Sequence, residues 1–254
     1  FIETSLFDVI QYEKNNLGLV RAFDKTNVLT ADNLLKKAAD KFVSLIGKTP
    51  FGVDFHIEKK IPIGGGMGGG SANAASVLKI LNSIWKINYS RKKLQSIGKL
   101  IGADVPFFIK GGVQKVTGIG DILTPLKADN FKLDILLILP EVSVSTVSAY
   151  KFIDDNNLSL STYENNKKFK NLVCGIQTGN KKIITENIYN KFETVIFKEY
   201  PVLDSIKEKL LKAGADAAFM SGSGSTMVGI FNEKQKTLEA SNFFNEQGYK
   251  TVVI

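Results

Sequence analysis

The chain has 254 residues, of which 44% are apolar and 23% are charged, and its formal net charge is +8. These are the proportions of a soluble globular protein that is long enough for one large domain or two modest ones. No apolar run approaches the ~18 residues of a membrane-spanning helix, nothing resembles a signal peptide, and the single cysteine, Cys174, excludes a disulfide within the chain. We therefore expect a cytoplasmic protein, from a bacterium rather than a plastid.

The basic surplus has several interpretations. It fits a nucleic-acid partner, a membrane surface or a polyanionic small substrate. It also fits a lysine-rich composition whose side chains are simply solvated. The lysines are scattered in pairs along the chain rather than concentrated in one arm, so the sequence does not indicate a single large basic patch.

The first half of the chain predicts three helices and a strand. Apolar residues recur at helical spacing over residues 30–46, and alternation over residues 52–61 predicts a half-buried strand. A glycine run follows, and residues 72–85 then have a helical pattern. Ser90 is the expected N-cap of another helix that extends through Leu100.

The second half predicts an α+β sandwich of the ferredoxin-like type. Residues 133–139 have the pattern of a buried strand, and two helical stretches surround a polar segment at 154–170. The last predicted elements are strands at 216–220, 226–231 and 249–254 and a helix over 233–247. The domain boundary is expected in the short polar stretch 127–130.

The glycine run is the main functional signal. Six of the seven residues 64–70 are glycine, between a predicted strand and a predicted helix. Backbone N–H groups without side chains can close on phosphate oxygens, and a following helix adds its dipole. The alternative is a flexible connector, but a connector does not need the Ile-Pro-Ile before the run or the Ala-rich helix after it.

The residues around the run narrow the choice of phosphate ligand. A dinucleotide fold expects an acidic residue ~20 positions further on, yet no Asp or Glu lies between Glu58 and Asp104. A Walker loop would end in Gly-Lys-Ser or Gly-Lys-Thr, which is also missing. The phosphates would then be held by the backbone and the helix dipole, helped by Ser71 and nearby lysines.

Asp104 is the first carboxylate after the run, in the segment Gly-Ala-Asp-Val-Pro-Phe-Phe. It is either a helix cap or a general base that accepts the proton of an attacking hydroxyl. A carboxylate, an anion-binding backbone and Mg²⁺ suffice for phosphoryl transfer. A second glycine loop at residues 220–226 is either a plain β-turn or a segment that packs against the first loop or contacts substrate.

The segments 61–75, 102–108 and 118–126, in this order and spacing, resemble the GHMP kinase superfamily, with weaker matches at 32–34 and 140–146. Within it they are most similar to the kinases that phosphorylate 4-diphosphocytidyl-2-C-methyl-D-erythritol. The resemblance implies a two-domain α+β fold, with an S5-like α+β N-terminal domain at 1–128 and a ferredoxin-like sandwich at 129–254. It also implies ATP-dependent phosphorylation of that substrate's 2-hydroxyl in non-mevalonate isoprenoid biosynthesis.

The resemblance assigns roles to individual residues. Asp104 is the implied catalytic base, and Thr146 and Tyr150 are implied to lie on the substrate side, Tyr150 stacking on cytosine. Ser71 is the implied contact to Mg²⁺. The residues implied to bind ATP are Pro62, Ile63, Gly64, Gly65, Gly66, Met67, Gly68, Gly69, Gly70, Ser71 and Ala72, with Asn33 and Lys59 near the adenine.

Two departures from the family pattern stand out. The family begins with a strand that carries a catalytic lysine, followed by a Tyr-His pair. The present sequence opens at a segment that resembles the stretch after that pair, so we expect the first strand to be missing from it. Position 72 is alanine where a second serine is usual, which leaves Ser71 alone to serve phosphate or Mg²⁺.

Two other functions remain as alternatives. One is another small-molecule kinase of the same superfamily, of mevalonate or homoserine type. The other is a basic RNA-binding module, which would present an aromatic and arginine-rich surface; Arg21 and Arg91 are the only arginines. We expect a small-molecule substrate, no nucleic-acid or membrane partner, and a monomer or weak homodimer.

Overall fold

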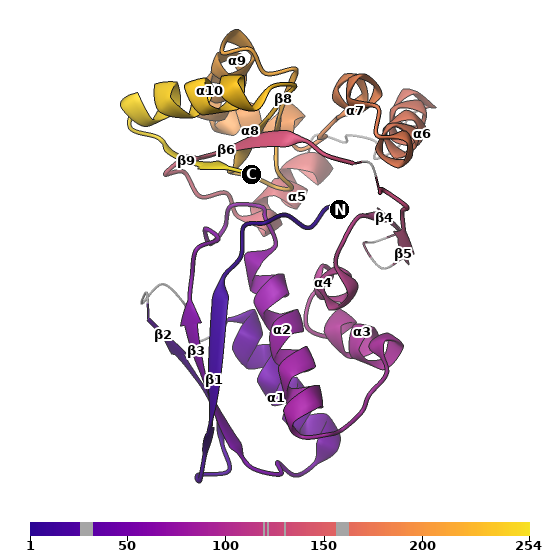
Figure 1. Ribbon diagram of the computed structural model, residues 1–254, viewed down its shortest axis with the longest axis vertical. Helices are drawn as coiled ribbons and strands as arrows, with labels where there is room; N and C mark the ends of the chain where they lie inside the picture. The colour runs from indigo at the N-terminus through magenta and orange to yellow at the C-terminus, as the bar shows by residue number, and fades with distance from the viewer. Residues whose placement is uncertain (26–32, 119, 121, 130, 156–162) are drawn as a thin grey trace. The chain divides into compact units, whose positions relative to one another are not determined.

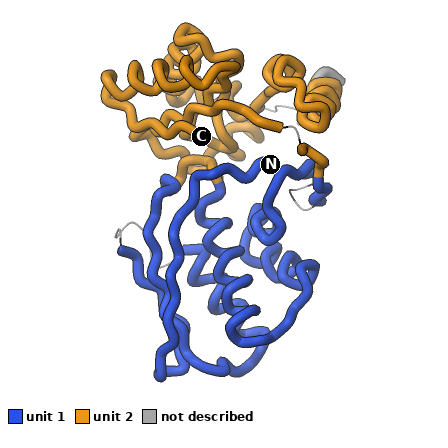
Figure 2. The backbone as a smooth tube through the Cα atoms, viewed as in Figure 1, with its two compact units in different colours: residues 1–63, 68–125 blue, residues 64–67, 126–254 orange. Residues whose placement is uncertain are grey.

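The computed structural model describes residues 1–25, 33–118, 120, 122–129, 131–155 and 163–254. The chain divides into two compact units, each treated by itself below. Unit 1 is Phe1–Ile63 with Gly68–Pro125, and unit 2 is Gly64–Met67 with Leu126–Ile254 (Figure 2). Four residues of the glycine run therefore belong to the second unit. The expected division at residue 128 stays a prediction.

Unit 1 contains a three-stranded sheet in the order β1-β3-β2 (Figure 1). β3 is central, antiparallel to β1 and parallel to β2. Its inward side chains Val53, Phe55 and Ile57 are fully buried. The strands are β1 (Val9–Asn15), β2 (Val20–Asp24) and β3 (Gly52–Glu58). The strand predicted at 52–61 ends three residues early, because residues 60 and 61 donate their backbone N–H groups to Asp8 instead of to a neighbouring strand.

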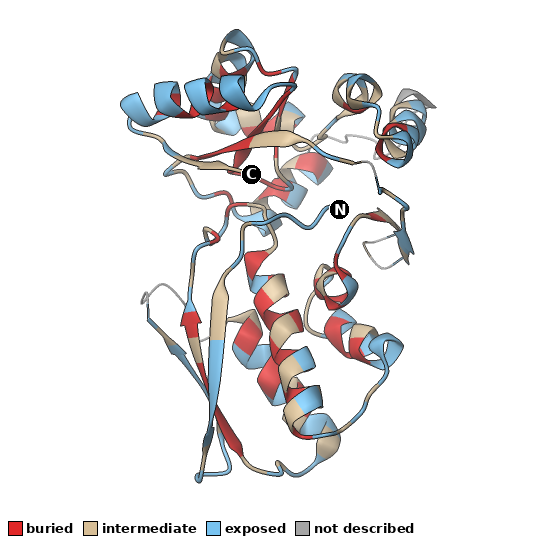
Figure 3. Ribbon diagram, viewed as in Figure 1, coloured by how far each residue is buried: buried red, intermediate tan, exposed pale blue. Residues whose placement is uncertain are grey.

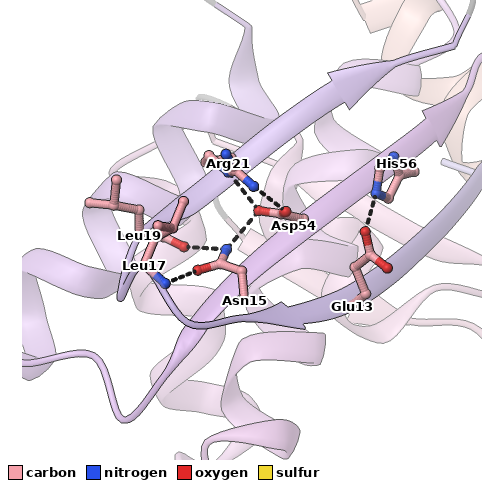
Figure 4. Close-up of polar contacts among 7 residues, drawn as sticks. All are labelled: Glu13, Asn15, Leu17, Leu19, Arg21, Asp54 and His56. Atoms are coloured by element: carbon pink, nitrogen blue, oxygen red, sulfur yellow. Dashed lines mark hydrogen bonds and ion pairs between the residues drawn. The ribbon is translucent and has the colours of Figure 1, made fainter.

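Asp54 departs from the predicted alternation. The pattern placed it on the exposed face of the strand, but it is only 6% exposed. Its carboxylate accepts hydrogen bonds from the guanidinium of Arg21 and from the side-chain amide of Asn15, at 2.5–2.8 Å (Figure 4). These hydrogen bonds lower the pKa of Asp54, and the bond from Arg21 has the largest effect. A charge can be buried here because neighbouring strands supply donors.

Of the helices of unit 1, α1 and α2 share a core with this sheet, and α3 and α4 pack against α2. α1 begins at Leu34 because Asn33, in an extended conformation, caps it; the predicted start at residues 30–32 lies outside the described residues. α2 begins at Gly69, three residues before the predicted start, so the end of the glycine run is helical. Ser90 caps α3 as predicted. The elements are α1 (Leu34–Ile46), α2 (Gly69–Ile84), α3 (Arg91–Lys99), α4 (Val105–Lys110) and the hairpin β4 (Gln114–Thr117) and β5 (Ile122–Pro125).

The core of unit 1 lies between α1, α2 and β3. Phe42, Phe55, Leu78 and Leu81 are fully buried there, and Trp85 is 5% exposed. Figure 3 shows buried stretches of the ribbon in these elements. α2 also packs against α4, and Lys79 donates to the carbonyl of Phe108 at 3.3 Å. This packing connects the helix after the glycine run to the helix after Asp104.

Unit 2 is built on a four-stranded antiparallel sheet in the order β7-β8-β6-β9. With these strands numbered in chain order the sheet runs 2-3-1-4, which confirms the predicted ferredoxin-like sandwich. β6 is central: Leu136 pairs with Gly229 on one side and Val253 on the other. The strands are β6 (Asp134–Leu139), β7 (Ala217–Met220), β8 (Met227–Phe231) and β9 (Lys250–Val253).

Six helices complete the described part of unit 2. α9 and α10 pack against the sheet, and α5 packs against α8. The polar segment predicted at 154–170 includes the end of α5 and the start of α6, and residues 156–162 lie outside the described residues. No helix in the described part of the chain combines the length and apolarity needed to span a membrane. The helices are α5 (Thr146–Asp155), α6 (Tyr163–Thr178), α7 (Lys181–Asn187), α8 (Glu193–Glu199), α9 (Pro201–Lys212) and α10 (Lys234–Glu246).

Candidate active site

The N-terminus of α2 in unit 1 has the properties of an anion site. Gly68 occupies the N-cap in the left-handed conformation, with φ 68°, and supplies no side-chain cap. Among the described residues, no acceptor bonds the backbone N–H of Gly69, Gly70 or Ser71, and the first turn contains no acidic residue. The helix dipole adds partial positive charge at the same place. Phosphate oxygens are the natural partners of such donors.

Glycine is required at the start of α2 by close packing as well as by conformation. A Cβ on Gly68 would lie 2.9 Å from the ring of Phe108, and a Cβ on Gly69 would lie 2.8 Å from the side chain of Ile61. A methyl group at either place would displace its neighbour. The glycines thus let unit 1 close tightly around the first turn of α2.

Lys59 lies beside this turn, in a buried ion pair. Its ammonium is 3.3 Å from the position of a Cβ on Gly69. The ammonium pairs with Asp8, and the two side chains are 5% and 1% exposed. The other carboxylate oxygen of Asp8 accepts the backbone N–H groups of Lys60 and Ile61, at 2.7 and 2.8 Å. Asp8 therefore fixes the chain that leads into the glycine run.

In unit 2, the first glycine segment (residues 64–67) lies against the second glycine loop (residues 220–226). The Ser221 hydroxyl donates to the carbonyl of Gly66 at 3.0 Å, and the Thr226 N–H donates to the carbonyl of Gly65 at 3.3 Å. Gly66 has φ 71°, and a Cβ there would be 2.1 Å from the Ser221 carbonyl oxygen. Of the alternatives for the second loop, packing against the first is therefore the one that the structure supports.

Asp104 of unit 1 occupies the N-cap position of α4 but does not act as a cap. Its side chain makes no capping hydrogen bond, and no other partner contacts its carboxylate among the described residues. Burial raises the pKa of this carboxyl above the ordinary value of 3.8. A half-buried carboxyl without a structural partner has the properties of a general base.

The remaining predicted site residues have distinct surroundings. Ser71 is 8% exposed on the first turn of α2, and the Asn33 side chain caps α1 by accepting from the Lys36 N–H at 2.9 Å. In unit 2, the Thr146 hydroxyl is 3.0 Å from that of Ser223, and Tyr150 is 54% exposed. The roles assigned to all of them stay predictions.

The described residues do not form a metal centre of their own. No group of three His, Cys, Asp or Glu side chains among them could hold a metal ion. Mg²⁺ is usually bound by one or two protein oxygens together with substrate phosphates. The hydroxyl of Ser71, beside the open N–H groups of α2, fits that pattern, so Mg²⁺ would enter together with the nucleotide.

Sequence analysis missed two parts of this site. Asp8, which holds Lys59, is an isolated acid before a strand, and nothing in the sequence connects it to residue 59. Asn190 and Glu193, which bond the second glycine loop, act on backbone groups 27 or more positions away. Such pairings leave no local signature, and only the folded chain shows them.

Two family models match this chain. The GHMP kinases N terminal domain matches residues 33–112, and the GHMP kinases C terminal domain matches residues 177–250. The chain is also 38% identical to 4-diphosphocytidyl-2-C-methyl-D-erythritol kinase of Alkaliphilus oremlandii, over 87% of this chain and 74% of that protein.

The chain belongs to the GHMP kinase family. It is accordingly a small-molecule kinase that takes its phosphoryl group from ATP. A second relative of this GHMP kinase, 4-diphosphocytidyl-2-C-methyl-D-erythritol kinase of Clostridium novyi, is 35% identical over 98% of the present chain and 86% of its own. A crystal structure of 4-(cytidine 5'-diphospho)-2C-methyl-D-erythritol kinase has the same fold, with a TM-score of 0.78, 24% identity, and coverage of 97% of this chain and 84% of that one.

The raised pKa of Asp104 predicts a pH-dependent stability effect. Above 3.8 the unfolded state releases the Asp104 proton more readily than the folded state does, so ionisation of this group destabilises the kinase as pH rises. Asp104→Asn removes the charge and should melt at a higher temperature than wild type at pH 7, with the difference disappearing below pH 3.8. Thermal melts over this range measure it. The exposed Asp40→Asn on α1 is the control and should show no such gain. An Asp104→Asn protein that is less stable at pH 7 would show that the carboxylate has a structural partner.

Proposed function

We propose that this GHMP kinase phosphorylates 4-diphosphocytidyl-2-C-methyl-D-erythritol at its 2-hydroxyl, as a step in non-mevalonate isoprenoid precursor biosynthesis. The observation that carries the choice of substrate is the 38% identity, over 87% of the chain, to a kinase of that name. Unit 1 supports the chemistry, because it contains both a helix N-terminus suited to an anion and a carboxyl, that of Asp104, with no partner among the described residues.

We assign catalysis to Asp104 acting as general base. Its carboxylate takes the proton of the substrate hydroxyl as the hydroxyl oxygen forms a bond to the γ-phosphorus of ATP. The bond between that phosphorus and the β,γ-bridging oxygen breaks, and ADP leaves. Such a reaction asks the protein mainly for positioning and for neutralisation of charge. A base is most effective when its pKa is close to the working pH, and the burial of Asp104 moves its pKa in that direction.

The ATP phosphates are assigned to the stretch from Pro62 to Ala72. The open N–H groups of Gly69, Gly70 and Ser71 are the donors that support this assignment. Bound Mg²⁺ would neutralise part of the triphosphate charge, with the Ser71 hydroxyl as the protein's oxygen donor. Lys59 lies beside Gly69, where its charge is paired with that of Asp8. Asn33 and Lys59 are the residues proposed to lie near the adenine.

The second substrate is assigned to α5 of unit 2. Tyr150 is exposed and so is free to stack on cytosine, and Thr146 lies one turn earlier on the same helix. The diphosphate of the substrate gives part of the +8 charge a purpose. We place the enzyme in the bacterial cytoplasm, as a monomer or weak homodimer without nucleic-acid or membrane partners.

Turnover with competing substrates tests the assignment. The complete protein, as its gene encodes it, should form ADP from ATP in the presence of the cytidyl substrate. Homoserine and mevalonate should support less than about 1% of that rate, because a site built for a diphosphate and an aromatic base leaves its polar groups unpaired with either. A coupled ADP assay measures all three. Faster turnover with homoserine or mevalonate would instead assign the chain to another branch of the family.

Replacing Asp104 tests the general base. Asp104→Asn should reduce kcat by ~100-fold or more, as is typical for loss of a positioned base. Calorimetric titration with the non-hydrolysable analogue β,γ-imido-ATP should give the wild-type affinity, because the phosphates are assigned to other groups. The matched control is Asp40→Asn on α1, which should retain the full rate. If Asp104→Asn keeps its activity, the carboxyl is not the base.

A further inference from the structure

The second glycine loop is held on its other side by a short segment, residues 190–193, that leads into α8 and includes its first residue. The side-chain amide of Asn190 donates to two carbonyl oxygens of the loop, that of Met220 at 2.6 Å and that of Gly222 at 2.8 Å. The Glu193 carboxylate accepts the Met220 N–H at 2.8 Å. Both backbone groups of Met220 are therefore bound by this one segment.

The side chains of Asn190 and Glu193 are themselves fixed. The amide oxygen of Asn190 accepts the backbone N–H of Phe192 at 3.0 Å, so the amide is oriented with its NH₂ group towards the loop. The second oxygen of Glu193 binds the Lys207 ammonium at 2.5 Å, and the Glu193 side chain is 12% exposed. Every polar atom that faces the loop has a matched partner, which makes the arrangement rigid.

The same segment contacts α5. The Phe192 ring meets the Tyr150 ring edge to face, with centroids 5.1 Å apart and an interplanar angle of 89°. Such a contact sets the direction of an otherwise exposed tyrosine side chain. Residues 190–193 thus lie against two features of unit 2 at once: the loop that holds the first glycine segment, and the aromatic side chain on α5.

We propose that residues 190–193 are a positioning element for both substrates. Asn190 fixes the conformation of the second glycine loop, and Ser221 of that loop donates a hydrogen bond to Gly66 of the first glycine segment. Asn190 thereby determines the affinity for ATP phosphates. Phe192 sets Tyr150 and so determines the affinity for the second substrate; this half rests on the proposed function. Neither residue touches a reacting atom.

Asn190→Asp tests the first half. The change keeps the shape of the side chain but turns an oxygen towards two carbonyl oxygens, which replaces two hydrogen bonds by repulsion. The dissociation constant of β,γ-imido-ATP, measured by calorimetry, should rise by about 10-fold or more. The affinity for adenosine, which has no phosphate, should change by less than about 2-fold. A merely structural role would move both affinities or neither.

The matched control is Asn187→Asp at the end of α7, where the side chain donates to the Ile183 carbonyl and contacts no glycine loop. It should bind the analogue as wild type does. Ser221→Ala tests the same link without adding a charge, and it too should weaken the analogue. Combined with Asn190→Asp, it should have less than the sum of the separate effects, because the two residues act in series. An unchanged analogue affinity in Asn190→Asp or Ser221→Ala, or full additivity, overturns the proposal.

Phe192→Leu tests the second half. It keeps an apolar side chain but loses the ring contact, so it should raise the KM for the cytidyl substrate about 5-fold while the affinity for β,γ-imido-ATP stays at the wild-type value. Asn190→Asp should thus weaken binding of the ATP analogue alone, and Phe192→Leu should weaken binding of the second substrate alone. Analogue binding does not involve the second substrate, so a wrong substrate assignment leaves the Asn190 result intact. A Phe192→Leu enzyme with unchanged KM for a substrate that wild type turns over would show that the ring contact positions nothing.

Discussion

The first glycine segment depends on a backbone contact that only glycine permits. A Cβ on Gly66 would lie 2.1 Å from the carbonyl oxygen of Ser221 and 2.8 Å from that of Gly224. Gly222 is restricted in the same way from the other side, because a Cβ there would lie 2.8 Å from the carbonyl oxygen of Gly66. Two main-chain segments more than 150 residues apart in the sequence are thus in direct contact, and the hydroxyl of Ser221 donates a hydrogen bond from one to the other. The position of the first segment follows from the second loop and its supports.

Electrostatics explains why the neighbouring part of unit 1 stays ready for an anion. The first turn of α2 contains no acid, and the nearby carboxylate of Asp8 is neutralised by Lys59 and by two backbone N–H groups. Asp104 is the exception, because it is half-buried and has no partner among the residues that the structure describes. Groups that lower stability in this way concentrate at functional sites, where the same burial tunes their pKa.

Much of this could be predicted from sequence, because the decisive signals were local. The glycine run, the position of Asp104 after it, the Ser90 cap and the order of strands and helices along unit 2 all followed from patterns within a few residues. The predicted start of α2 at residue 72 was wrong, because glycine is a poor helix former and packing imposes the helical conformation of Gly69 and Gly70. Asp54 and Asn190 could not be predicted, since their partners lie on other segments and, for Asn190, are backbone carbonyls common to every residue.

The most direct test of this arrangement compares two glycine variants that carry the same backbone strain. Gly66 and Gly248 both have positive φ, 71° and 84°, but a Cβ at Gly248 meets nothing within 4 Å. Each change to alanine costs roughly 1 kcal/mol of conformational strain. Calorimetry with β,γ-imido-ATP should show that Gly66→Ala weakens binding by at least about 10-fold, while Gly248→Ala binds as wild type does. Wild-type affinity in Gly66→Ala would contradict our proposal that contact between the two glycine loops positions the segment assigned to ATP.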